Sequence, residues 1–404
     1  MTVLRVYRSS LRTRAAEETF ALAAALAPGL GITRVTEITR LDRLGVPVCV
    51  AIRPDALPGN VCVSAGKGFT LAEARAGALM EAIELAFAEH GRAPFELVRA
   101  TGRDVLDGRT RSAALLDLCP IWGRTLDLDE PLWACTVADL DTGEPVVVPA
   151  EAVMHPLPLS LGGARHFGSS SNGLASGNSI DEATVHALAE VIERDVTSFH
   201  NARDTGLLVR PESLPDEIQT LRRDWAERGF DLIVRYLPGE AGLPTFNAYG
   251  FDRAQPDVTL RGDGCHASRA IALARAITET VQCRLSLIHG GRDDLDLVYR
   301  GVAHLGAVDR SRFYADALAG YRRDAPQIDY ADVPDFPDAA TSLEACLARL
   351  RDALARAGLA RVLRCVYTPP DCPIAVVRVL VPGLEFYARD TRRIGPRLRR
   401  FMRA

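Results

Sequence analysis

The chain has 404 residues, of which 48% are hydrophobic and 25% charged, an ordinary balance for a globular enzyme. A formal net charge of −4 provides no general attraction for nucleic acids or anionic membranes, which excludes both as default partners. Nine cysteines form no CxxC pair, which argues against a zinc ribbon and a disulfide framework. No apolar run is long enough to span a bilayer, and the first residues lack the pattern of a signal peptide. We therefore expect a cytoplasmic protein.

Residues 1–60 are predicted to form an N-terminal segment that packs on the core. Residues 15–27 have a helical pattern that ends at Pro28-Gly29, and residues 32–38 and 46–53 are typical of strands.

A short strand at residues 61–64 leads into a Gly66-Lys67-Gly68 loop and the first acidic helix. Thr70 and Glu73 form a capping-box pair at the start of this helix, and Gly91 ends it. Lys67 could reach a bound phosphate, although the GxxxxGK[ST] spacing of a Walker loop is absent. A solvent-exposed lysine is the alternative. Further along, residues 132–137 and 145–148 predict a β-hairpin around Asp141-Thr142-Gly143.

Residues 169–195 contain the most informative pattern of the chain. A serine- and glycine-rich loop precedes a helix that Ser179 can cap, with Glu182 as its capping-box partner. Glu182, His186, Glu190 and Glu193 follow helical spacings and share one face beside an apolar stripe. Aligned carboxylates are costly to bury unless cations separate them, and oxygen ligands suit Mg²⁺. The helix N-terminus favours phosphate, so we expect a site for Mg²⁺ and a nucleotide. An exposed acidic helix is the alternative.

This pattern recurs, which favours the functional interpretation. Residues 70–85 align without a gap on residues 179–194, so that Glu81 matches Glu190 and Glu84 matches Glu193. A fainter third copy begins at Ser268 and places Glu279 and Gln282 at the positions of the acidic pair. The repeat predicts three loop–helix units whose acidic faces converge on one centre.

The remaining elements alternate between helices and strands. Helices are predicted at residues 216–229, 268–289 and 343–357, and strands at residues 232–236, 247–251, 361–367 and 374–381. Arg292-Asp293-Asp294 is either a catalytic cluster or a polar loop, and residues 300–340 suggest a linker or surface excursion. The basic end of the chain is either a solvated tail or a dock for an acidic partner. The hairpins and irregular connections predict an α+β fold with antiparallel or mixed sheets, formed by one integrated domain.

Several long phrases resemble the YcaO family of ATP-using, peptide-modifying enzymes. They are GKGFTLAEARAGALMEAIE, SNGLASGNSIDEATVHALAEVIERD, the ITETVQCRL–GGRDD pair and VVRVLVPGLE, and GITRVTEITRLDRLGVPV resembles the opening region of the family. The resemblance implies one YcaO catalytic domain over residues 61–404, with the repeated units around a single ATP site.

The resemblance assigns the site residues of the family to matching positions in this chain. The resemblance implies that the catalytic, Mg²⁺-holding carboxylates are those of Glu81, Glu84, Glu190 and Glu193. It implies a nucleotide site that contains Asn178, Glu182, Glu279, Gln282 and Arg284, to which we add Lys67 and Arg194. Gly77 and Leu85 replace the Ser and Arg usual in the first motif of the family, and His186 stands where a Gln is frequent. These departures leave open an altered nucleotide pose, a residue supplied by a partner, or a weakened enzyme.

The family implies that ATP phosphorylates a backbone amide oxygen and thereby makes the carbonyl carbon electrophilic. External sulfide would then give a thioamide, whereas a Cys, Ser or Thr side chain of the substrate would give an azoline. The basic GPRLRRFMRA ending and the lack of a fused leader-binding extension resemble stand-alone members that work with a TfuA partner. We therefore expect thioamide formation on a precursor peptide or protein, with a TfuA-like protein and a sulfide or other sulfur donor. Self-association as a homodimer is left open.

Three alternatives remain. The first is an azoline-forming cyclodehydratase with a separate partner protein. The second is a non-catalytic accessory factor for ribosomal-protein methylthiolation, and the third is a structural protein with exposed acidic helices. A sulfur relay through Cys265 or Cys283 is a further possibility, but buried structural thiols are the more probable interpretation.

Overall fold

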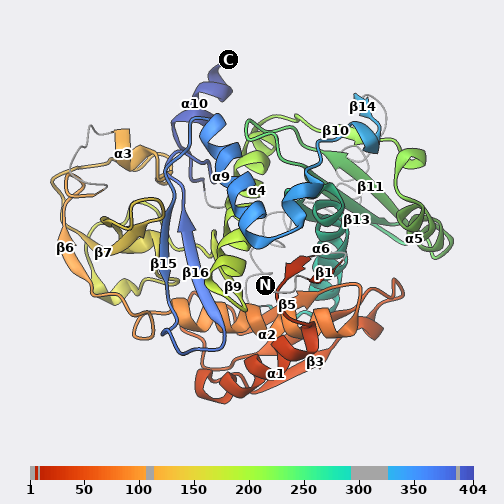
Figure 1. The fold of residues 1–404 in the computed structure, drawn as a ribbon, viewed down its shortest axis with the longest axis horizontal. Helices are drawn as coiled ribbons and strands as arrows, with labels where there is room; N and C mark the ends of the chain where they lie inside the picture. The colour runs from red at the N-terminus through yellow and green to blue at the C-terminus, as the bar shows by residue number, and fades with distance from the viewer. Residues whose placement is uncertain (1–4, 8–9, 106–112, 293–325, 388–391) are drawn as a thin grey trace.

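The computed structural model describes residues 5–7, 10–105, 113–292, 326–387 and 392–404 (Figure 1). Four sheets and the helices that cover them form the described part of the chain. Nearly every pairing between named strands is antiparallel, and the parallel exception joins β10 to β14. The predicted α+β class with antiparallel and mixed sheets is therefore confirmed.

The first two sheets are formed by the N-terminal part of the chain. A short hairpin pairs β1 (Arg5–Tyr7) with β2 (Ser10–Arg12). The three-stranded sheet has the order β3 (Arg34–Glu37), β4 (Val48–Ile52) and β5 (Val63–Lys67). Because β4 and β5 are paired, residues 1–60 join the rest of the chain through a shared sheet.

The two larger sheets lie on either side of the central helix α4 (Figure 1). One has the order β6 (Val98–Ala100), β7 (Leu132–Asp139), β15 (Leu363–Val366), β16 (Ala375–Leu380) and β9 (Leu174–Gly177), with β8 (Pro145–Pro149) paired to β7. The other has the order β13 (Gln255–Cys265), β12 (Thr245–Asp252), β11 (Phe230–Tyr236), β10 (Leu207–Val209) and β14 (Gln327–Ile328). The β7–β8 pairing confirms the predicted hairpin.

Three long helices each follow directly on a strand and pack against its sheet. Strand β5 leads into α2 (Leu71–Ala88), β9 into α4 (Ile180–Ala202), and β13 into α6 (Arg269–His289). In the part of the chain that the structure describes, the other α-helices are α1 (Ala16–Leu26), which packs on α2, α3 (Ala113–Leu116), α5 (Asp216–Glu227), α9 (Leu343–Arg356) and α10 (Pro396–Arg403). The repeat seen in the sequence is therefore a strand–turn–helix unit that occurs three times.

Glycines allow these strands to lie directly against their helices. A Cβ atom on Gly66 would fall 2.0 Å from the backbone nitrogen of Ala78, and one on Gly264 would fall 2.1 Å from the carbonyl oxygen of Ala272. The predicted Gly66-Lys67-Gly68 loop is therefore partly wrong, since Gly66 and Lys67 belong to β5. Glycine serves close packing here, rather than a flexible phosphate-binding turn.

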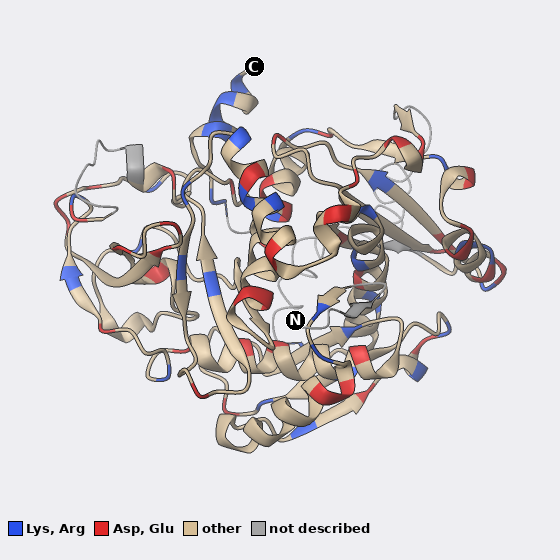
Figure 2. Cartoon of the chain, in the orientation of Figure 1, with Lys and Arg blue, Asp and Glu red and all other residues tan. Residues whose placement is uncertain are grey.

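Most predicted helices and strands are confirmed to within a few residues, but several segments differ. Within the predicted serine- and glycine-rich loop, Leu174–Gly177 form strand β9, and the short strands β1, β2, β6, β10 and β14 were not predicted. The long strand β13 was not predicted, because Gly262 and Gly264 resemble loop residues in the sequence. The basic end is only in part a solvated tail: it forms α10, in which Leu398 is buried and Arg397 pairs with Asp195. Figure 2 shows the basic residues of α10 near the C-terminus.

Two predicted features fall wholly or partly outside the described residues, namely Asp293-Asp294 and most of residues 300–340. None of the helices that the structure describes is long and apolar enough to cross a membrane.

Candidate active site

Five glutamates approach one centre from α2, α4 and α6. Burial raises the pKa of Glu81 to about 7, and the charges of Glu279 and Glu190 contribute to the rise. The pKa of Glu84 rises to about 8, again chiefly through burial, with contributions from Glu81 and Glu190. Burial also raises the pKa of Glu193 to about 7, and Glu279 contributes. Carboxylates from three separate repeats therefore influence one another, as the repeat predicted.

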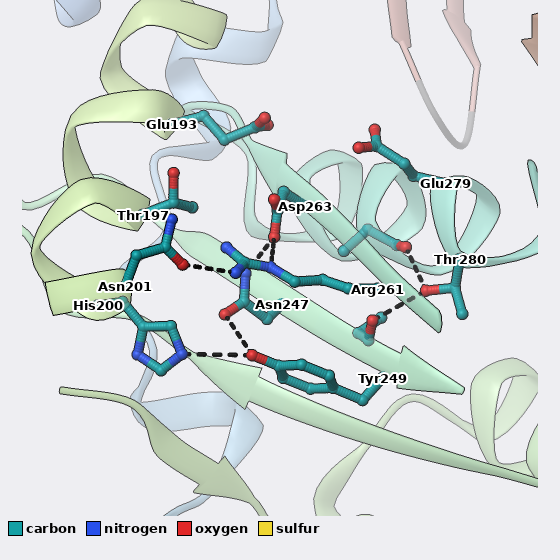
Figure 3. Close-up of polar contacts among 12 residues, drawn as sticks. Glu193, Thr197, His200, Asn201, Asn247, Tyr249, Arg261, Asp263, Glu279 and Thr280 are labelled. Carbon is teal, nitrogen blue, oxygen red and sulfur yellow. Dashed lines mark hydrogen bonds and ion pairs between the residues drawn. The ribbon is translucent and has the colours of Figure 1, made fainter. Parts of the chain in front are cut away.

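Main-chain and hydroxyl donors hold two of these carboxylates in place. Glu84 accepts hydrogen bonds from the backbone N–H of Ser176 at 2.8 Å and from its hydroxyl at 2.5 Å. Glu193 accepts one from the backbone N–H of Cys265 at 3.0 Å. Strands β9 and β13 therefore fix carboxylates of the neighbouring helices. Figure 3 shows Glu193 and Glu279 projecting from α4 and α6 toward the same region.

Glu279 differs from the other four because its pKa is lowered rather than raised. Its carboxylate pairs with the ammonium group of Lys67 on β5. Burial opposes the ionisation of Glu279, but Lys67, Arg194 and Arg275 more than offset it, so that the net shift of the pKa is downward. Lys67 is therefore neither an isolated surface lysine nor a loop residue. It links the first repeat to the third.

Further cations border the acidic centre. Arg194 lies 3.9 Å from Glu193 and 3.8 Å from Asp263, and nearby carboxylates raise its pKa despite burial. His186 lies 3.3 Å from the guanidinium of Arg275. Its pKa is held well below the usual range by burial and by Arg275, Arg12 and Lys67, so that His186 is neutral. The region between the helices thus contains both carboxylates and cations.

The predicted residues Asn178 and Glu182 contact the N-terminal segment. Ser179 caps α4 as predicted, but the Glu182 side chain does not complete a capping box. It accepts hydrogen bonds from Arg12 at 3.1 Å and from the hydroxyl and N–H of Thr13, while Asn178 accepts one from Thr19. Sequence reasoning missed Arg12 and Thr13, because their partner lies 170 positions away and no local pattern marks them.

The structure brings Gln282 to the edge of the site but places Arg284 elsewhere. Gln282 donates a hydrogen bond to the carbonyl of Ala65, which ties α6 to β5. Arg284 points away toward Asp42 and Asp252, with donor–acceptor distances of 2.8 to 3.0 Å. Five positions separate Arg284 from Glu279 along α6, which puts the two side chains on different helix faces. Its guanidinium therefore pairs with these two aspartates rather than with the acidic centre.

Two of the three departures from the family pattern lie outside this centre, whereas His186 borders it beside Arg275. Leu85 is buried in the hydrophobic core with Ile83 and Leu79. Gly77 faces β5, where a Cβ would come 3.4 Å from the Cα of Gly66. All nine cysteines are free, and burial raises the pKa of Cys265 to about 12 and that of Cys283 above its usual value. Neither thiol is activated for a sulfur relay at neutral pH.

The carboxylates and cations of this centre determine whether it can hold Mg²⁺ and a nucleotide. Within the described ranges, no three His, Cys, Asp or Glu side chains lie close enough together to hold a metal ion by themselves. Mg²⁺ usually takes one or two carboxylates together with phosphate oxygens and water, so this spacing fits an ion that arrives with a nucleotide. The carboxylates with raised pKa values are those of Glu81, Glu84, Glu190 and Glu193, and their oxygens are hard ligands. Positive charge that suits phosphates comes from Lys67, Arg12, Arg194 and Arg275.

Comparison with known proteins gives concordant results. The sequence model of a family described as YcaO cyclodehydratase, ATP- and Mg²⁺-binding, matches residues 65–385. An uncharacterised protein of Methanothermobacter thermautotrophicus is 36% identical over 92% of this chain and 94% of its own length. A Rhizobium leguminosarum bv. trifolii protein, described as an uncharacterised protein in the tfuA 3′ region, is 32% identical over 90% of this chain and 86% of its own. The structure of YcaO from Methanopyrus kandleri bound with AMPPCP and Mg²⁺ superposes with a TM-score of 0.74, at 26% identity, and covers 98% of both chains.

Proposed function

The chain belongs to the YcaO family, and on this premise we propose that it activates a peptide backbone amide with ATP and inserts sulfur to form a thioamide. ATP and Mg²⁺ are the cofactors of the family. The observation that carries the proposal is the set of four carboxylates with raised pKa values, Glu81, Glu84, Glu190 and Glu193, in which Glu190 contributes to the raised pKa of both Glu81 and Glu84. Such a set is stabilised when a divalent cation binds.

The overall reaction balances without a redox partner. An amide, hydrogen sulfide and ATP give a thioamide, ADP and inorganic phosphate, so the amide oxygen leaves on the phosphate. ATP supplies the phosphoryl group that makes this oxygen a leaving group, and Mg²⁺ offsets the charge that develops during transfer.

Different residues of the chain would bind the metal, contact the phosphates and stabilise charge on the transferred group. Glu81 and Glu84 from α2, with Glu190 and Glu193 from α4, would hold the metal together with phosphate oxygens, because their pKa values stay raised despite the neighbouring cations and a metal would favour their ionised forms. Lys67, Arg12 and Arg275 would contact phosphates through charge-assisted hydrogen bonds. Arg194 lies at the edge of the carboxylate set, where it can stabilise charge on the transferred group.

The choice of sulfide as nucleophile and of a TfuA-like partner rests on a relative. The Rhizobium protein named for the tfuA region is similar to this chain over most of both lengths. The family description as a cyclodehydratase favours azoline formation as a second candidate. In that reaction a Cys, Ser or Thr side chain of the substrate replaces sulfide, and the product is an azoline ring.

The two candidates can be separated with pairs of blocked peptides that do or do not contain Cys, Ser and Thr. Each peptide is incubated with the protein, Mg-ATP and sulfide, with and without a TfuA-like protein, and analysed by mass spectrometry. We expect oxygen to be replaced by sulfur even in peptides that contain none of these residues. Loss of water only from peptides that do contain them would instead establish the cyclodehydratase.

The variant with Glu190→Gln and Glu193→Gln controls for ATP use in this assay. If neither product forms and ATP turnover is the same in wild type and variant, an accessory role replaces both enzymatic candidates.

A further inference from the structure

A cavity of about 390 Å³ adjoins the acidic centre at Glu190 and Arg194. These two residues of α4 line the cavity and also belong to the centre formed with α2 and α6. Anything that fills the cavity therefore contacts the same two side chains that border the nucleotide site. The volume lies within the range of about 300–1,000 Å³ that is usual for small-ligand pockets.

The uncharged part of the wall is suited to an amide backbone. Ser170, Ser171 and Asn172 line it from the loop before β9, and Thr197 and Asn201 line it from α4. The aromatic residues Phe386 and Tyr387 complete this part. Hydroxyl and amide groups both donate and accept hydrogen bonds, as peptide units do, and aromatic rings provide apolar contact without charge.

One acceptor in this wall lacks a partner. The side-chain oxygen of Asn172 is buried and accepts no hydrogen bond from any described residue. A buried carbonyl oxygen without a donor is costly, and a ligand N–H would offset that cost.

The charged part of the wall is internally compensated. Arg261 donates a hydrogen bond to Asp263 at 2.8 Å, and Arg194 lies 3.8 Å from the same carboxylate. An anionic ligand such as phosphate would compete with Asp263 for both guanidinium groups. The charge balance therefore favours a neutral ligand.

A hydrogen-bonded network behind the wall fixes Arg261 and Asp263 in position (Figure 3). Asn201 accepts a hydrogen bond from Arg261 at 2.8 Å, and Asn247 donates one to Asp263. The Tyr249 hydroxyl in turn donates to Asn247 at 3.3 Å.

His200 completes this network. Its Nε2 lies 3.3 Å from the Tyr249 hydroxyl, and its Nδ1 accepts a hydrogen bond from the N–H of Thr205. The pKa of His200 is lowered to about 4, chiefly by burial, so the ring is neutral and Nε2 carries the proton. The wall is thus pre-organised without a ligand, which lowers the cost of binding.

We propose that this cavity binds the backbone of the peptide to be modified and presents one neutral amide to the nucleotide at Glu190 and Arg194. This inference rests on the proposed function, because it assigns the second substrate of the same reaction. Asn172 would accept a peptide N–H, and the Arg261–Asp263 pair would position the chain.

The test measures peptide and nucleotide binding separately. The probe is N-acetyl-triglycine amide, a neutral blocked peptide, followed by saturation-transfer NMR in the presence of Mg-AMPPCP. Two variants perturb the cavity: Ser171→Phe fills it from an exposed loop position, and Asn201→Leu removes the hydrogen bond to Arg261. Ser160→Phe makes the same change as the first variant at an exposed position that does not line the cavity.

We expect each cavity variant to bind the peptide at least about tenfold more weakly than wild type and Ser160→Phe, with Mg-AMPPCP affinity unchanged in all four proteins. Equal peptide binding by wild type and both cavity variants would overturn the inference. So would the absence of peptide binding to a wild type that binds Mg-AMPPCP. Failure of wild type to bind Mg-AMPPCP would contradict the proposed function instead.

Discussion

Acids of this protein fall into two groups, those whose pKa is lowered by neighbouring cations and those whose pKa stays raised despite them. Asp252 shares Arg284 with Asp42, and Glu279 pairs with Lys67; the pKa values of Asp252 and Glu279 are lowered in spite of burial. In contrast, the pKa values of Glu81, Glu84, Glu190 and Glu193 are raised, chiefly by burial, although Arg194 lies 3.9 Å from Glu193. The first group contributes to folding, and the second is suited to binding a cation.

The difference shows why a row of acids on a helix is not by itself a metal site. Glu279 aligns with Glu81 and Glu190 in the repeat, yet its pKa is lowered and theirs are raised. What separates them is the close ion pair that Lys67 of β5 supplies to Glu279, since a buried carboxylate without enough positive charge nearby disfavours the folded state until a cation binds.

The largest effect is expected from Arg284→Met, which removes the cation shared by Asp42 and Asp252. Asp42 would lose this partner and Asp252 would keep Arg43 alone of its two arginines, so the free energy of unfolding should fall by about 3–5 kcal/mol. Chemical denaturation measures this change, and Arg253→Met, at an exposed arginine that pairs with Asp231, should have a much smaller effect. Because Arg284 points away from the acidic centre, Mg-ATP affinity should persist in the folded fraction. Loss of affinity in that fraction would place Arg284 in the nucleotide site after all.

Next in size is the combined change Glu190→Gln and Glu193→Gln, which removes two carboxylates whose pKa values are raised. We expect Mg-ATP to bind roughly 100-fold more weakly, because each lost charged interaction is worth about 1.5 kcal/mol or more. Thermal stability without ligand should rise or stay constant, since unpaired buried charge is removed. Calorimetry and thermal denaturation provide the two readouts.

The matched control for this variant is Glu212→Gln with Glu227→Gln, at two exposed positions. It changes the net charge by the same amount and should leave both readouts near wild type. Equal nucleotide affinity in all three proteins would rule out α4 as part of the site.

A smaller effect is expected from Lys67→Met, which converts Glu279 from the first group to the second. Mg-ATP affinity should fall by about tenfold, and the pKa of Glu279 should rise because its nearest cation is gone. Lys67→Met combined with Glu279→Gln should recover part of the stability lost in the single variant. Additive effects of the two changes would show that the pair is not coupled.

Much of the fold could be predicted from local patterns. The 3.6-residue periodicity located α2, α4 and α6, and the match between residues 70–85 and 179–194 indicated that their acidic faces converge. Strand β13 was missed because its glycines are required by contact with α6, and a partner element cannot be seen in a local window.

The site was predictable to the same extent. Its carboxylates follow a repeat, so they were found, whereas Arg12 and the Arg261–Asp263 pair depend on tertiary contacts with α4 and were not. Arg284 was assigned through sequence position alone, and the helix face on which it lies decided its real partners. The positive charge near a carboxylate depends on tertiary structure. The close ion pair with Lys67 distinguishes Glu279 from the four other glutamates.

Proton release on Mg-ATP binding tests most directly whether Glu81, Glu84, Glu190 and Glu193, whose pKa values are raised in the free protein, hold the metal. In the free protein, pKa values of about 7 for Glu81 and Glu193 and about 8 for Glu84 leave these groups partly protonated at pH 7. A bound cation favours the ionised forms, so binding must release protons, and affinity must rise between pH 6 and 8. Titration of preformed Mg-ATP by calorimetry, in buffers of different ionisation enthalpy, should show net release of about one proton or more at pH 7. No release, with affinity independent of pH over this range, would contradict the account.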